Sequence, residues 1–265
     1  MNQISEQELR DAIIAIKKDA KLVAAAKNDR INSAESLYKE FAKLPVERQR
    51  EIIASIATDY FVAAYWKIAF PLNSLPAAAA ADAVAAAGKA LFFAREEECL
   101  KETIRALRLF VQSPFYKTIA SCLGDAAEIV RSDLAVVARI LTDPDIFGLI
   151  RSLDPNVPVS ERIVQCIARV AMYTRDPDST MTVAKFLYAR RHSSAVEAIA
   201  GLIENTVFMA RDRKSVREIL AGLGAGAVDR VLQRHAENKG VLANIRDVAW
   251  KTRDSDSIRS YLEAL

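Results

Sequence analysis

Apolar and polar positions along this chain follow the spacing of helices that bury one face. The C-terminal tail is a short example, because Ile258, Tyr261, Leu262 and Leu265 recur at i, i+3, i+4 and i+7 and form one apolar stripe. No run of β-branched or aromatic residues alternates at period two between turn signals, and no Asn-Gly or Asp-Gly hairpin dipeptide occurs. The pattern predicts an all-α protein.

One stretch of the pattern recurs: VAMYTRDPDS at 170–179 returns as VAWKTRDSDS at 248–257. The register anchored on Arg175 and Arg253 also fits around Arg211 and Arg95, and more weakly around Arg131. Successive anchors are separated by 36, 44, 36 and 42 residues. These intervals are typical of two- or three-helix solenoid units. We interpret the Arg-Asp pair itself as a helix end followed by the start of the next helix.

Each anchor arginine follows a helical pattern in which one polar position lies between buried ones. The residue eight positions before the anchor is always apolar, and the two residues after the polar position are mostly small and apolar. The polar position lies six residues before the anchor, and we call these residues the polar row: Lys89, Asp125, Arg169, Asn205 and Asp247. Five amphipathic patterns in one register predict five equivalent helices.

The intervals between anchors have room for the helices that they must contain. Pro144 stands where a proline of the first helical turn is favoured, and Ser160 where an N-cap is favoured. Beyond residue 130 the predicted helices are 132–141, 144–152, 160–174, 179–191, 194–210, 214–222, 225–235 and 239–252. The N-terminal part predicts helices at 5–27, 33–43 and 46–69, outside the register.

The segment GAVDRVLQRHAENKGVLANIRDVAWKT (226–252) resembles an armadillo repeat, and SSAVEAIAGLIENTVFMA (193–210) resembles a shorter, HEAT-like unit. The resemblance implies a right-handed armadillo/HEAT-like α-solenoid. We expect an N-terminal helical cap or degenerate repeats over 1–75, about five repeats over 76–257, and a capping helix at 258–265. An oligomer contact is the alternative role of the last segment.

In peptide-binding armadillo proteins, the position of the polar row is commonly asparagine, whose amide both donates to and accepts from an extended peptide backbone. Only Asn205 keeps that residue type here. The row alternates in sign, so its members could instead form salt bridges between neighbouring repeats. Binding and salt bridging both remain open at this point.

Composition and charge bear on three questions: nucleic-acid binding, the cellular compartment and membrane insertion. The net charge of +3 comes from 37 basic and 34 acidic residues, which neither requires nor excludes nucleic acid. Three widely spaced cysteines on apolar patterns predict reduced core residues in a cytosol-like compartment. The alanine-rich stretch 75–94 is interrupted by Asp82 and Lys89, which argues against a membrane span, and no targeting segment is visible.

No constellation of reactive residues stands out. With only His192 and His235, no Cys-x-x-Cys and no His-Glu-x-x-His, the usual ligands of a metal site are missing. GLGAG at 222–226 is better explained as a helix stop than as a nucleotide loop. The run Glu96, Glu97 and Glu98 suits a helix start. We expect neither a cofactor nor an enzyme.

Two functional hypotheses follow. The first is a scaffold or adaptor that binds a protein partner, within a multiprotein complex or alone, through a concave face carrying the polar row. The second is a nucleic-acid binder or ribonucleoprotein organiser, with Tyr188 available for stacking. Its basic patch would be Arg190, Arg191, Arg211, Arg213 and Lys214.

Overall fold

The computed structural model contains helices and no strands within the residues that it describes. Those residues are 38–39, 41–51, 77–94, 96–193, 195–210, 212–224, 227–235 and 239–265. The all-α prediction is therefore confirmed for this part of the chain. The helices predicted at 5–27, 33–43 and 46–69 lie mainly outside these residues, as do the anchors Arg95 and Arg211.

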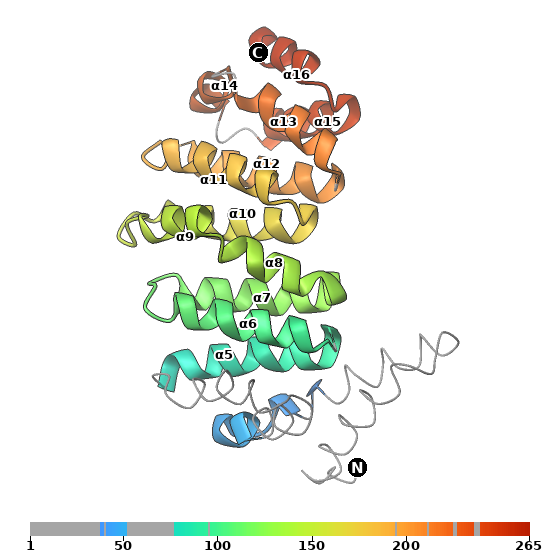
Figure 1. Cartoon of the computed structure of the whole chain (residues 1–265). Coiled ribbons are helices and arrows are strands. Elements are labelled where there is room, and N and C mark those ends of the chain that lie inside the picture. Colours follow the sequence, from blue (N-terminus) through green and yellow to red (C-terminus); the bar gives the residue numbers. More distant parts are fainter. Residues whose placement is uncertain are drawn as a thin grey trace, which may run out of the picture. The chain divides into compact units, whose positions relative to one another are not determined.

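The chain divides into two compact units, Met1–Arg139 and Ile140–Leu265, and the division falls within α8 (Leu134–Leu141). In the first unit, α5 and α7 pack side by side and α6 packs on both of them (Figure 1). The bounds of the elements before α8 are α5 Ala77–Lys89, the π-helical turn η3 Ala90–Ala94, α6 Glu97–Phe110, α7 Tyr116–Val130 and the 3-10 turn η4 Arg131–Asp133.

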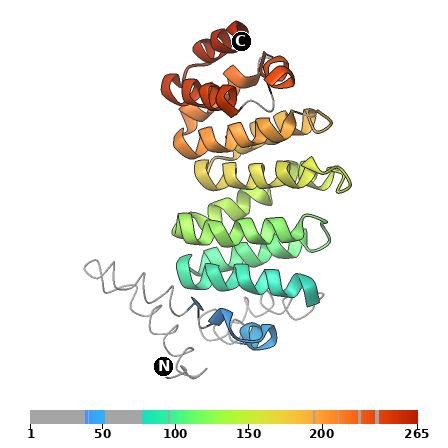
Figure 2. The same cartoon turned by 180° about the vertical axis from the view of Figure 1, so that it is seen from behind.

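The second unit is built from two layers of helices, with α14 and α16 at its C-terminal end. One layer consists of α10, α12 and α15, and we call it the row layer; Figure 2 shows it from its exposed side. The other layer consists of α9, α11 and α13. The bounds are α9 Pro144–Arg151, α10 Val159–Thr174, α11 Pro177–Ala189, α12 Val196–Ala210, α13 Arg213–Gly224, α14 Ala227–His235, α15 Lys239–Thr252 and α16 Ser255–Ala264.

Anchor arginines mark the ends of helices through an unusual backbone conformation. Among the described residues other than glycine, only Arg131, Arg175 and Arg253 have a positive φ, at 48°, 52° and 50°. The backbone N–H groups of Arg175 and Arg253 donate to the carbonyls of Ala171 and Ala249, at 2.9 and 3.1 Å. A left-handed residue at this place stops a helix and satisfies one of its last carbonyls.

An aspartate follows the anchors at 175, 211 and 253 in the sequence, and it begins the next helix. Asp176, Asp212 and Asp254 each accept a hydrogen bond from the backbone N–H of the serine three residues later, at 3.0, 2.8 and 2.8 Å. A carboxylate in this position satisfies an N–H group that lacks a partner within the helix and favours the positive end of the helix dipole. The repeated Arg-Asp-x-x-Ser sequence is therefore a helix stop followed at once by a helix start.

Pro144 occupies the first turn of α9, as its position predicts, and Asp143 caps that helix. The N-cap predicted at Ser160 is wrong. Helix α10 begins one residue earlier, at Val159, and Ser160 is buried inside its first turn. The Ser160 hydroxyl donates instead to the Asp154 carbonyl at 2.7 Å, so it ties the preceding loop to the helix.

The C-terminal helix α16 packs against α13, α14 and α15. Ile258 and Leu262 are buried on this contact, while Leu265 is 37% exposed. A Cβ on Gly222 of α13 would stand only 2.8 Å from the Cβ of Ile258, so the absence of a side chain lets the two helices approach. The apolar stripe of the tail thus covers the end of its own unit.

Helix α5, which carries most of the alanine-rich stretch, has 13 residues. Within the described ranges, no helix is both long and apolar enough to cross a membrane.

Candidate functional site

The polar row falls on corresponding helices of the two units. Lys89 and Asp125 lie on α5 and α7 of the first unit, and Arg169, Asn205 and Asp247 lie on the row layer of the second. Asn205 is exposed and the other four side chains are partly buried.

In the first unit the row forms a salt bridge. The Lys89 ammonium lies 3.7 Å from the Asp125 carboxylate and 2.7 Å from that of Glu128. Burial alone would lower the pKa of Lys89, but the hydrogen bond to Glu128 and the nearby carboxylates outweigh it and raise the pKa. Lys89 is therefore a fixed cation that joins two neighbouring helices.

In the second unit Arg169 also pairs with a neighbouring helix, but with Glu204 instead of the next row member. Glu204 of α12 is only 7% exposed, and both Arg162 and Arg169 of α10 contact its carboxylate. The distance from Arg162 Nη1 to Glu204 Oε2 is 2.7 Å. A buried carboxylate requires such compensation, and here two guanidinium groups share one negative charge.

Asn205 lies in a groove between α12 and α15 with a volume of about 270 Å³. No hydrogen-bond partner for the Asn205 side chain occurs in the described part of the chain. The groove is mainly apolar and is lined by Ala198, Gly201, Leu202, Asn205, Leu242, Ala243 and Arg246. An exposed amide in the middle of an apolar groove can donate to and accept from a bound peptide backbone.

Asp247 follows the lining residue Arg246 in the chain and is bound by it. Arg246 donates to Asp247 Oδ1 through Nε and Nη2, at 3.0 and 2.9 Å. Both side chains remain about 40% exposed, with 38% for Arg246 and 43% for Asp247. The pair therefore keeps hydrogen-bonding capacity toward solvent.

Aromatic and apolar side chains extend this surface along α12. Phe208 and Met209 are 45% and 37% exposed, and they follow Asn205 by one helical turn. The Phe208 ring packs edge-on against Tyr173 of α10, with ring centroids 5.1 Å apart. Trp250 of α15 holds the guanidinium of Arg253 over its ring at 4.1 Å. Large exposed apolar groups beside a groove are typical of a contact surface.

Sequence reasoning missed most of the groove, because only one of its lining residues, Asn205, belongs to the polar row. A usable signal exists on α12, where Ala198, Gly201, Leu202 and Asn205 have the spacing i, i+3, i+4 and i+7. Small residues in that stripe allow a depression. The α15 side has no local signal, since Ala243 and Arg246 matter only once α15 is known to pack beside α12.

The residues of the basic patch do not gather in one place where the structure describes them. Arg190 and Arg191 lie at the C-terminal end of α11, whereas Lys214 is exposed in the first turn of α13. The pair between Arg217 and Asp178, at 2.7 Å, brings the N-terminal ends of α13 and α11 together. The two groups are thus separated by the length of α11. Arg211 and the side chain of Arg213 lie outside the described parts.

The arginines at the end of α11 already have partners. Arg190 binds the Asp229 carboxylate through Nε at 2.9 Å and Nη2 at 2.8 Å, and lies over the Phe186 ring at 3.8 Å. Arg191 covers one face of the Tyr188 ring at 4.2 Å and donates to the Tyr188 carbonyl. These contacts reduce what the two guanidinium groups and the ring can offer a phosphate or a base.

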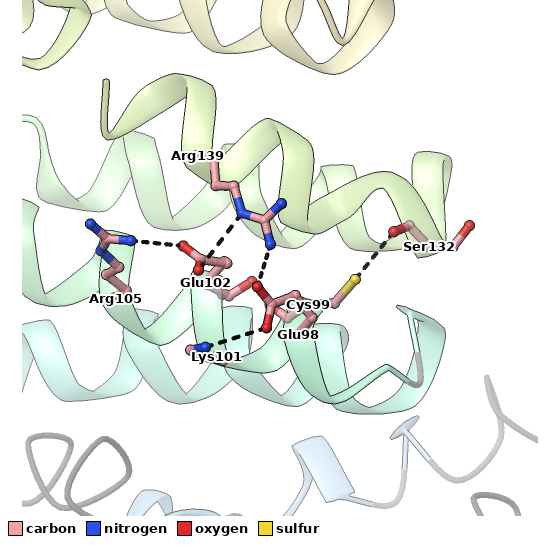
Figure 3. Close-up of polar contacts among 8 residues, drawn as sticks. Glu98, Cys99, Lys101, Glu102, Arg105, Ser132 and Arg139 are labelled. Atoms are coloured by element: carbon pink, nitrogen blue, oxygen red, sulfur yellow. Dashed lines mark hydrogen bonds and ion pairs between the residues drawn. The ribbon is translucent and has the colours of Figure 1, made fainter. Parts of the chain in front are cut away.

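Glu98, the last residue of the acidic run at the start of α6, is part of an ion-pair cluster (Figure 3). Arg139 contacts Glu98 and lies 3.7 Å from the buried Glu102 carboxylate, while Arg105 approaches Glu102 at 3.5 Å. Burial would raise the pKa of Glu98, but the hydrogen bond from Arg139 and the charge of Lys101 lower it overall. A general acid needs a raised pKa at neutral pH, so Glu98 is unsuited to that role.

Cysteine chemistry is also suppressed where the thiols are buried. Burial raises the pKa of Cys166 to about 12, and its thiol donates to the Ala200 carbonyl at 3.4 Å. Cys99 is buried as well, and its thiol lies 3.4 Å from the Ser132 carbonyl (Figure 3). A nucleophilic cysteine needs an accessible thiolate, which neither position provides. Among the described residues, no group of three or more His, Cys, Asp or Glu side chains could hold a metal ion.

Comparison of this chain with protein-family models, with curated proteins and with solved structures finds no match.

Proposed function

We propose that the chain is a non-enzymatic α-solenoid of armadillo/HEAT type that serves as a scaffold or adaptor and binds a protein partner. The row layer is the contact face in this proposal, and in a solenoid of this type it forms the concave side. The observation that carries the proposal is the α12–α15 groove, where an exposed amide stands among apolar groups and next to the exposed Phe208 and Met209.

The spacing of ion pairs supports a repeat architecture. Among the described residues of each unit, ion pairs between helices join residues 35 to 42 positions apart, close to the intervals between anchor arginines. These pairs are Lys89–Asp125, Lys89–Glu128, Arg139–Glu98, Arg139–Glu102, Arg162–Glu204, Arg169–Glu204, Arg190–Asp229, Arg217–Asp178 and Arg253–Asp212. Contacts restricted to the next repeat are characteristic of solenoids.

Solenoid stacking leaves one layer of helices available for a partner. The row members of the first unit are engaged with each other, so the proposal assigns direct recognition chiefly to Asn205 and its surroundings. Lys89 and Arg169 hold neighbouring helices in register and contribute charge at the edge of the face. Interface centres are enriched in aromatic residues, methionine and arginine, which are the residue types exposed around Asn205.

The test is affinity purification from native extract with the full chain and with a variant in which Lys89, Arg169 and Asn205 are all replaced by alanine. The proposal predicts that the main protein partners of the full chain are lost from the variant. A control variant replaces Lys185 and Arg217, which are exposed residues of α11 and α13 in the other layer. Retention of every partner by the first variant would show that the row layer is not the contact face.

Binding to nucleic acid is the second proposal, and salt dependence separates it from the first. Contacts to several phosphates make affinity fall steeply as salt rises. A flat salt titration, or no shift of RNA or DNA at low salt, would eliminate it. If nuclease treatment released every purified partner, the ribonucleoprotein role would replace the protein adaptor.

A further inference from the structure

We propose that the exposed face of α6 binds an acidic amphipathic helix of a partner protein. This face carries the α6 stripe, which consists of Lys101, Arg105 and Arg108 at the spacing i, i+4 and i+7. The proposed function assigns recognition to the row layer of the second unit, so a contact on α6 of the first unit goes beyond it. Three observations support the inference: the charge of the stripe, the way its arginines are held, and the apolar side chains beside it.

The charge of the stripe comes chiefly from two arginines. Along residues 101–110 the only acidic side chain is that of Glu102, and it is only 5% exposed. The Arg105 side chain, by contrast, is 62% exposed, and Arg108 is exposed as well. Arg108 makes no ion pair or hydrogen bond with any residue that the structure describes. This part of α6 therefore presents positive charge to solvent without a matching surface carboxylate.

The buried Glu102 carboxylate orients the neighbouring guanidinium groups (Figure 3). Arg105 Nη1 lies 3.5 Å from Glu102 Oε2, and Arg139 Nε of α8 lies 3.7 Å from Oε1. Lys101 and Arg139 also contact Glu98, so they contribute less unbalanced charge than Arg105. An arginine has five N–H donors, so Arg105 keeps most of its donors for a ligand. Because the guanidinium is already held in place, binding costs it less conformational entropy.

Exposed apolar side chains stand beside the arginines. Leu109 is 43% exposed and follows Arg105 by four residues, which is one helical turn. Val136 is 36% exposed and precedes Arg139 by three residues on α8. Apolar surface next to charge is typical of a protein contact, because aliphatic side chains of the partner can cover it. The ligand should therefore carry apolar residues beside its acidic ones.

The period of the stripe suits a helical ligand. The rise of a helix separates its three cations along α6 by about 6 Å and about 4.5 Å. A second helix that runs beside α6 has the same rise, so carboxylates at matching positions can each meet one cation. An extended segment presents side chains of one face about 6.6 Å apart, so it is out of step at the third cation. Hydrogen bonds from arginine to a carboxylate are about twice as strong as neutral ones, which favours Asp and Glu at these positions.

Nucleic acid fits this surface less well. Single-stranded nucleic acid binds through aromatic rings as well as through cations. The aromatic side chains at and just after the end of α6 are buried and offer no ring to a base; they are Phe110, Phe115 and Tyr116. Two arginines also neutralise few phosphates. An acidic helix uses both the cations and the exposed apolar groups.

The experiment measures binding of labelled, alanine-rich helical peptides to the full chain by fluorescence anisotropy. Two probes cover the two directions in which a ligand helix can run: one has Glu at i, i+4 and i+7, and the other at i, i+3 and i+7, with Leu beside each Glu. In the control peptides Gln replaces every Glu. We expect one Glu probe to bind, with an affinity that falls as salt rises, and the Gln peptides not to bind. Arg105→Gln should weaken binding by about threefold, as expected for one exposed charge pair.

A charge swap at Arg108 tests the pairing itself and does not depend on the buried Glu102. Arg108→Glu removes no internal contact, and circular dichroism checks that the variant folds. It should weaken binding by about tenfold, because an attraction becomes a repulsion. Binding should return when Lys replaces the peptide Glu that faces this position. Arg234→Glu is the matched control, since Arg234 is likewise an exposed arginine in the last turn of its helix, α14, and it should leave binding unchanged.

Other outcomes overturn the inference. These are no binding of either Glu probe at low salt, equal binding of the Gln peptides, an equal loss with Arg234→Glu, and a charge swap that restores nothing. If a uridine homopolymer binds more tightly than the Glu probes and Arg108→Glu removes that binding, the ligand of this surface is nucleic acid and the inference is wrong. The proposed function fails in a different way, namely by retention of all purified partners when Lys89, Arg169 and Asn205 are replaced.

Discussion

Replacing Asp176 by alanine tests whether the repeated Arg-Asp sequence is a structural device. Asp176 is 6% exposed, and its Oδ2 accepts from the Ser179 backbone N–H at 3.0 Å and from the Ser179 hydroxyl at 2.6 Å. Loss of an N-cap costs about 1 kcal/mol. The buried Ser179 hydroxyl loses its acceptor as well, which costs about 1–2 kcal/mol. Asp176→Ala should therefore lower the free energy of unfolding by about 2–3 kcal/mol.

Asparagine is the matched control, because it caps helices about as well as aspartate and offers the same acceptor oxygen. Asp176→Asn should cost about 1 kcal/mol or less. Urea unfolding followed by helical circular dichroism measures both variants, and hydrogen exchange of the α11 amides isolates the helix within a chain that divides into two compact units. Equal stability of the alanine and asparagine variants, or unchanged exchange in α11, would refute the capping role.

Three further predictions concern packing, thiols and pH. Gly201→Ala should stabilise the chain by about 0.5–1 kcal/mol, because the new Cβ makes ordinary contacts. Gly222→Ala should destabilise the chain, because its Cβ would lie 2.8 Å from a side chain of α16. Thermal unfolding compares the two variants. A thiol reagent should modify the partly exposed Cys122 in the folded protein and should modify Cys166 only after unfolding. Burial raises the pKa of the Cys166 thiol to about 12, so the reactive thiolate does not form there in the folded protein. Hydrogen bonds from the first turn of α13 lower the pKa of Asp212, so stability should fall as the pH drops below about 4, and less so in Asp212→Asn.

Several helix bounds could be predicted from sequence because their signals are local. The helix predicted at 239–252 matches α15, Lys239–Thr252, and Pro144 marks the start of α9 as expected. The anchors Arg175 and Arg253 end their helices, and in both places the aspartate that caps the next helix follows directly. These features depend on neighbouring residues in the chain, which periodicity and capping preferences describe well.

The site was harder to predict, because its properties arise between helices. Arg169 belongs to the polar row, yet its contact with Glu204 could not be found from sequence, since it depends on how α10 and α12 are rotated against each other. The same holds for Arg246, which matters because α15 lies beside Asn205. Ser160 failed as a cap for a related reason: its hydroxyl binds the carbonyl of Asp154 in the preceding loop.

Site-specific photo-crosslinking tests the central claim most directly. A photoreactive amino acid replaces Asn205 in the groove, and in a separate variant it replaces Lys185, which is exposed on α11 in the other layer. After irradiation in native extract, the account predicts that discrete protein adducts form from position 205 and not from position 185. Identical adducts from both positions, adducts only from position 185, or adducts that nuclease removes would contradict it.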